Sequence, residues 1–116
     1  MSLTVLTSTP QALLEKINKF VREGKSQTWE IDADGDFTYK PEQWKNEAWF
    51  TVSLIKEDFI VFGMWPPVGK TISSEVYAVF HGRFLEMLLT HFDEDFTEIQ
   101  ISALATKYDR IKSISL

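Results

Sequence analysis

The sequence predicts an α+β fold with two layers, in which a mainly antiparallel sheet of five or six strands carries two helices. Three observations support this fold class. Two segments repeat apolar residues at helical spacing, the segments between and after them alternate apolar and polar residues, and two hairpins occur early in the chain. The predicted order of elements is α-β-β-β-β-α-β, and the early hairpins favour an antiparallel sheet with both helices on one face.

Residues 9–24 form the first predicted helix. Pro10 suits a first helical turn, Ser8 or Thr9 can cap the exposed amides, and Gly24 ends the helix. An apolar stripe at helical spacing consists of Leu13, Leu14, Ile17, Phe20 and Val21. We therefore expect an amphipathic helix that lies on another layer of the fold.

Four strands follow this helix. Around Trp29 and Ile31 apolar and polar residues alternate, Asp34-Gly35 is a strong hairpin signal, and a second strand ends at Pro41. Two longer strands are predicted at residues 48–55 and 59–65. Counting by two along the first of these places Trp49 and Ile55 on one face and Phe50, Val52 and Leu54 on the other. Because both faces are bulky and apolar, we expect this hairpin to be central in the sheet or to meet a partner.

Ser73 or Ser74 caps the second predicted helix, which has about five turns. Its broad apolar arc includes Tyr77, Phe80, Phe84, Met87, Leu88 and His91, and such an arc predicts burial against more than one layer. Residues 96–105 alternate again and predict a fifth strand, and residues 107–116 are either a short sixth strand or a frayed end. No linker, repeat or low-complexity tract interrupts the chain, so we expect residues 1–116 to form one domain.

The composition excludes several classes of protein. The 116 residues include 12 Lys and Arg against 17 Asp and Glu, a net charge of -5 that argues against general binding to nucleic acid or to anionic membranes. Without cysteine there is no disulfide scaffold, Cys-ligated zinc or thiol catalysis. We predict no cofactor. The first residues lack the basic region of a signal peptide, and no stretch has the roughly 20 apolar residues of a membrane span, so we expect a cytoplasmic protein.

Two motifs match known sites only in part. The segment from Gly63 to Gly69-Lys70 resembles a P-loop, but five residues separate the glycines where four are needed, and two prolines remove amides that would bind phosphate. Asp32, Asp34 and Asp36 resemble the start of a calcium loop. The glycine and the glutamate that such a loop needs further on are absent, so we interpret the segment as a hairpin turn with outward carboxylates.

The histidines give only weak support for catalysis. His81 lies on the apolar side of the second helix, where we expect a core histidine bonded to the backbone. His91 precedes the acidic run 93–95 and suits a helix end, where a cation is favoured. About 15 Å of helix separates the two, too far for one shared metal ion. We therefore favour a non-enzymatic protein over an enzyme, and predict neither catalytic residues nor a metal site.

Aromatic residues make up 14% of the chain, including 9 Phe and 4 Trp. This number is high for a sheet that helices cover on one face only. If both helices cover one face of the sheet, the second face is an apolar interface, most economically with a second copy of the chain. The candidate partner-binding residues are Trp44, Trp49, Trp65 and Pro66. Acidic residues are concentrated in segments 28–36 and 75–98 and would flank this surface.

The leading hypothesis is a homodimeric protein-interaction domain that binds a protein partner through an aromatic sheet face with acidic flanks. In element order and acidity the chain is similar to small partner-binding α+β proteins such as secretion chaperones and toxin-immunity proteins, a likeness of shape that assigns no site residues. The alternative is a small-ligand-binding or minor enzymatic domain. Its aromatic pocket would be lined by Trp29, Tyr39, Tyr77 and His81, together with Trp49 and Phe62.

Overall fold

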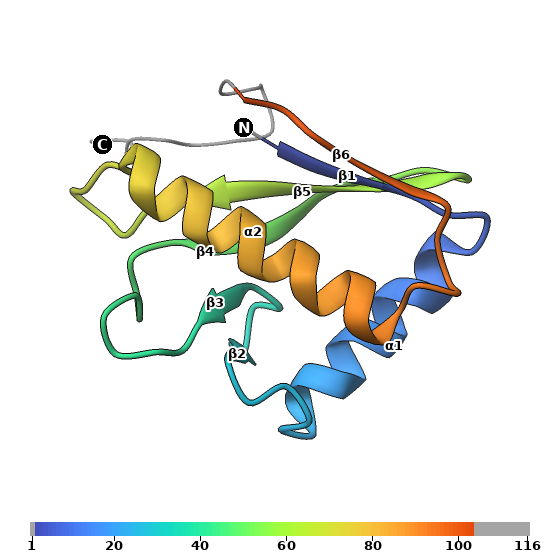
Figure 1. Ribbon diagram of the computed structural model, residues 1–116, viewed down its shortest axis with the longest axis horizontal. Coiled ribbons are helices and arrows are strands. Elements are labelled where there is room, and N and C mark those ends of the chain that lie inside the picture. Colours follow the sequence, from blue (N-terminus) through green and yellow to red (C-terminus); the bar gives the residue numbers. More distant parts are fainter. Residues whose placement is uncertain (1, 104–116) are drawn as a thin grey trace.

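The computed structural model describes residues 2–103 of the chain. They form a six-stranded antiparallel sheet with two helices (Figure 1), which confirms the predicted fold class. The elements, in chain order, are β1 (Ser2–Leu6), α1 (Pro10–Arg22), β2 (Trp29–Ile31), β3 (Phe37–Tyr39), β4 (Trp49–Ile55), β5 (Phe59–Trp65), α2 (Ser74–His91) and β6 (Glu98–Ile101).

From the first helix onward the order agrees with the sequence prediction, but an additional strand, β1, precedes that helix. Within the sheet the strand order is β2-β3-β4-β5-β1-β6, so β1 lies between β5 and β6 and pairs with both. Its alternation is short but clear, since Leu3 and Val5 are fully buried and Thr4 between them is not. The missed strand is therefore one of the central strands of the sheet.

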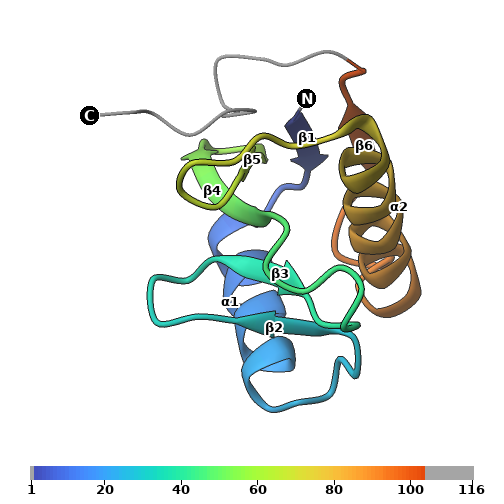
Figure 2. The same cartoon turned by 90° about the vertical axis from the view of Figure 1, so that its left-hand side faces the viewer.

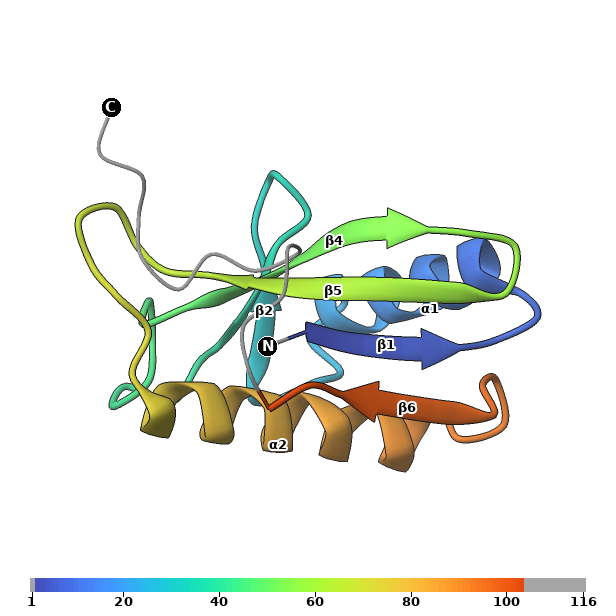
Figure 3. The ribbon, with the colours of Figure 1, turned by 90° about the horizontal axis from the view of Figure 1, so that it is seen from above.

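Both helices lie on the same side of the sheet. Strands β4, β5, β1 and β6 form a layer over α1 and α2, and β2 and β3 curl down beside the helices (Figures 2 and 3). The shared register shows which residues face the helices: Leu3 pairs with Phe62, Phe62 with Val52, and Phe37 with Phe50. We call the side of the sheet that faces away from the helices the outer face.

Local sequence signals account for the helix ends. Pro10 occupies the first turn of α1, and Gly24, with φ of 72°, follows its last turn in the left-handed region that favours glycine. Of the two candidate caps of α2, Ser73 is the one used, because its Oγ accepts a hydrogen bond from the Val76 amide at 3.1 Å. α1 ends two residues before the predicted limit of residue 24.

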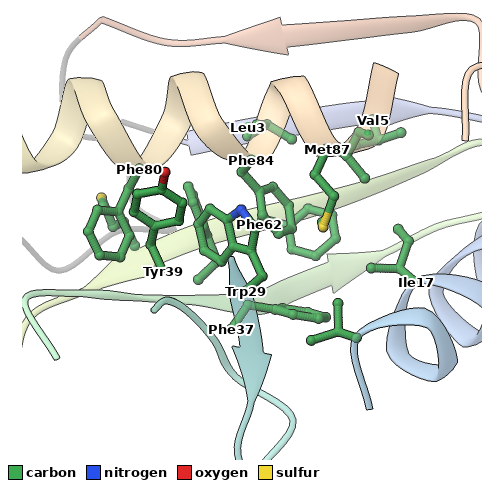
Figure 4. Close-up of a cluster of buried hydrophobic side chains, with 14 of the residues drawn as sticks. Leu3, Val5, Ile17, Trp29, Phe37, Tyr39, Phe62, Phe80, Phe84 and Met87 are labelled. Atoms are coloured by element: carbon green, nitrogen blue, oxygen red, sulfur yellow. The ribbon is translucent and has the colours of Figure 1, made fainter. Parts of the chain in front are cut away.

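The core is an assembly of aromatic rings between the sheet and α2 (Figure 4). Phe84 lies at its centre, with ring centroids 5.0 Å from Trp29, 5.6 Å from Phe37, 4.6 Å from Phe50 and 5.2 Å from Phe62. These four rings come from β2, β3, β4 and β5 in turn. One helical side chain thus joins four strands to α2, and most of the aromatic excess is core.

The last predicted strand is shorter than expected. Strand β6 covers Glu98–Ile101, and Ile99 and Ile101 face the helices as the alternation indicates. Residues 104 and 105 of that prediction, and the possible further strand at 107–116, lie outside the described residues. Among residues 2–103, no helix is long and apolar enough to cross a membrane.

Candidate functional site

Two tryptophans face each other across the central hairpin on the outer face. Trp49 is the register partner of Trp65, and the next pair, Phe50 with Met64, points into the core. Side chains alternate between the faces of a sheet, so both tryptophans project away from the helices. Directly opposed residues have Cβ atoms about 4.5–5.5 Å apart, which makes the pair one continuous surface. Trp65 is 40% exposed and Trp49 is partly buried.

A β-bulge changes which other apolar residues reach the outer face. Val52 pairs with Phe62 and Leu54 with Val61, which leaves Ser53 as an extra residue in β4. The prediction that Ile55 shares a face with Trp49 and Leu54 with Phe50 is therefore wrong. Ile55 faces the core, and Leu54 joins the tryptophans. The apolar side chains of the outer face are Leu6, Trp49, Leu54, Phe59, Val61 and Trp65.

The other two candidate partner-binding residues lie in different places. Pro66 follows Trp65 directly and begins the loop that leads to α2. In this loop Val68 is 94% exposed. Trp44 lies in the turns between β3 and β4, where its amide donates to the Pro41 carbonyl, and it packs against the hydrophobic core. The structure therefore places Trp49, Trp65 and Pro66 together and separates Trp44 from them.

Trp49 lies on the outer face, apart from the other residues of the alternative ligand pocket, and Phe62 is buried beside Phe84. The remaining four, Trp29, Tyr39, Tyr77 and His81, are buried in the core. They form two aromatic pairs: Trp29 and Tyr39, with ring centroids 5.2 Å apart, and Tyr77 and His81, 3.8 Å apart. His81 Nδ1 lies 3.0 Å from the Tyr77 carbonyl oxygen, which is the backbone bond expected for a core histidine. Phe80 contacts both Trp29 and Tyr39, so ring packing occupies the space beside that pair (Figure 4).

Two surface hollows lined by described residues lie elsewhere on the molecule. A groove of about 340 Å³ at the ends of the two helices is lined by Lys16, Lys19, Phe20, Glu23, Lys25, His91, Phe92 and Asp95. The rings of Phe20 and His91 are 4.5 Å apart there, and Lys16 forms a 2.9 Å ion pair with Asp95. An adjoining hollow of about 350 Å³ shares Lys25 and His91 with it.

The three aspartates of the β2–β3 turn lie together, with carboxylate oxygens within 4.8 Å of one another. The Asp32 carboxylate accepts hydrogen bonds from the amides of Asp34 and Asp36 at 2.9 and 3.0 Å, an arrangement that fixes the turn. Burial raises the pKa of Asp36 above its usual range, and the charges of Asp32 and Asp34 raise it further, whereas a hydrogen bond with Thr51 opposes the shift.

The candidate surface is the Trp49–Trp65 pair on the outer face, with acidic side chains in the neighbouring β2–β3 turn. The chain matches no protein-family model, no curated protein and no solved structure.

Proposed function

We propose that this chain is a non-enzymatic protein-interaction domain, which works as a homodimer and binds a protein partner through the outer face of its sheet. One observation carries the proposal: the Trp49–Trp65 pair lies on the face that neither α1 nor α2 covers. Tryptophan is enriched among residues that dominate binding energy, because it buries a large rigid area at little entropic cost. The pair has the position and chemistry of an interface anchor.

The charges around this face favour a basic partner. Glu30 is on the outer side of β2, since its neighbours Trp29 and Ile31 face the core side, and Glu98 is on the outer side of β6. The carboxylates of Asp32, Asp34 and Asp36 extend the negative charge into the β2–β3 turn. Such charges act mainly on the rate of association and on the choice of partner, and salt weakens their effect.

The enclosed position of His81 supports a binding role over a catalytic one. Its ring is buried against Tyr77 and also lies 4.8 Å from Phe50, out of reach of a dissolved substrate. The core aromatics that would form the alternative pocket are packed against one another (Figure 4). For these reasons we do not propose the ligand-binding alternative as a second function.

Affinity capture with matched variants tests the proposal. We expect to capture at least one protein that binds Trp49→Ala and Trp65→Ala at least about 30-fold more weakly than it binds the wild-type chain. That loss corresponds to the roughly 2 kcal/mol typical of an anchor residue. The control is Val68→Ala, an apolar truncation on an exposed loop, which should bind like the wild type. Purified partner and calorimetry give the affinities. If every captured protein binds the four chains equally, the outer face is not the interface and the proposal fails.

A further inference from the structure

Strand β6 is an edge strand of the sheet. The hydrogen-bonding pattern with β1 shows which of its backbone N–H and C=O groups do not face β1. The Ser102 amide donates to the Ser2 carbonyl at 3.0 Å, and Gln100 is the register partner of Thr4. In an antiparallel pair only alternate residues exchange hydrogen bonds with the neighbouring strand. The backbone groups of Ile99 and Ile101 therefore point away from β1, and no other strand within residues 2–103 pairs with them. Such an edge is a template for another strand.

An uncharged strip of helix lies next to this edge. Figures 2 and 3 show α2 running along β6, and the Tyr77 hydroxyl donates to the Ser102 carbonyl just beyond the strand. Met87, with Arg83 and Glu86, lines the hollow on one side of α2. A second stripe, here called the α2 flank, carries Ala78, Gly82, Leu85 and Leu89 at spacings of four, three and four residues, with Glu75 continuing it three residues before Ala78 and Glu86 at its border. This is the spacing of a seam between two helices.

The exposure of these residues is unusual for a chain that works alone. Leu89 is 50% exposed and Ile101 is 41% exposed. Gly82 lies in the middle of α2, where glycine costs about 1 kcal/mol relative to alanine. Apart from its own helical turn, a Cβ atom at this position would meet no atom of residues 2–103 within 4 Å, so packing among these residues does not require glycine. A glycine here allows the backbone of another element to approach closely.

We propose that two copies of the chain associate across a two-fold axis by pairing β6 with β6 in antiparallel orientation, with the two α2 flanks meeting beneath the joined sheet. The open backbone groups fix the register: Ile99 pairs with Ile101 of the second copy, and each of the two such pairs exchanges two hydrogen bonds. Gln100 then faces Gln100 at the axis. The surface is self-complementary, which a two-fold interface requires.

Charge placement agrees with this register. Glu98 lies opposite Ser102 of the second copy, so the two carboxylates do not face each other, and the charged residues next to the α2 flank, Glu75 and Glu86, lie outside the four residues that form it. Because each chain carries a net charge of -5, added salt screens the repulsion between copies and should strengthen the dimer. A basic peptide paired with the same edge would instead be weakened by salt. The outer face remains available to a partner protein, since the axis runs through the sheet edge.

Sedimentation equilibrium tests the association. We expect the wild type and Val68→Glu to change from 13.4 kDa to twice that mass between about 1 and 100 μM. Leu89→Glu and Ile101→Glu each place a glutamate from both copies into an apolar contact, where the carboxylates lose water, and should weaken dimerisation at least tenfold. Circular dichroism checks that both variants remain folded, and Leu89→Glu is the safer of the two because half of that side chain is already in solvent.

Amide hydrogen exchange identifies the surface. The Ile99 and Ile101 amides should become protected as the concentration rises, and Leu89→Glu should remove this protection. The Gln100 amide faces β1 and should be protected at every concentration. A monomer throughout the range overturns the proposal, and so does a dimer in which the Ile99 and Ile101 amides exchange freely. This proposal rests on the homodimer of the proposed function, which a monomer throughout the range would also remove, whereas the partner-binding face keeps its own test because Trp49 and Trp65 lie outside this surface.

Discussion

Asp36 is a residue whose environment opposes its own charge. Its side chain is partly buried beside the carboxylates of Asp32 and Asp34, and its pKa is raised as a result. A carboxyl whose folded pKa lies above its unfolded pKa destabilises the fold at neutral pH. That cost decreases as the pH falls through the folded pKa, and it is absent below the unfolded value near pH 4.

Asp36→Asn should therefore raise the free energy of unfolding at pH 7 and leave it unchanged at about pH 3. The amide oxygen of asparagine can still accept the Thr51 hydroxyl, so the neutral hydrogen bond is kept. Urea titrations at several pH values measure the difference. Glu57→Gln, which removes one carboxylate at an exposed turn, is the matched control for the loss of a negative charge. An equal gain at pH 3 and pH 7 would mean that charge is not the cause.

At the scale of elements, the sequence predicted both helices and five of the six strands. The helices, β4 and β5 have long apolar patterns, and the Asp34-Gly35 hairpin signal marks the short strands β2 and β3. The missed strand, β1, has only Leu3 and Val5 as core residues, and such a short alternation cannot by itself identify a strand. The sequence prediction assigned the faces of β4 by strict alternation of its side chains, with no inserted residue. The extra residue Ser53 moves Leu54 and Ile55 to the faces opposite those predicted. The residue types of β4 do not reveal where such a bulge occurs.

The bulge at Ser53 leads to a prediction about deletions in β4. Removing Ser53 leaves Val52, Leu54 and Ile55 in regular alternation on their present faces, so this deletion should fold and unfold cooperatively. Removing Thr51 instead forces either Phe50 or Val52 to the wrong face. We expect the second deletion to lose at least about 2 kcal/mol more than the first, the value of burying one such side chain. Denaturant unfolding of both variants measures this, and equal losses would contradict the assigned register.

In the whole molecule, aromatic residues lie in two places, the core and the outer face. Composition alone cannot tell which residue lies in which place. Most rings are core, joined through Phe84, and Trp49, Phe59 and Trp65 occupy the outer face. The sequence pattern indicated correctly that β4 and β5 are apolar on both faces. Which tryptophans share a surface depends on the pairing of strands, and this is why Trp44 could not be distinguished from Trp49 and Trp65 without the fold.

Phe84→Ala should destabilise the whole chain, since the ring contacts side chains from four strands and no other element can replace it. Truncating a buried phenylalanine costs about 3–5 kcal/mol, a large part of the roughly 5–15 kcal/mol that stabilises a typical domain. We expect one cooperative transition at much lower denaturant, followed alike by tryptophan fluorescence and circular dichroism. Leu89→Ala, on the exposed side of the same helix, should cost less than about 1 kcal/mol. If the two probes separate in Phe84→Ala, with the sheet unfolding before the helices, then Phe84 does not unite the layers in one cooperative core.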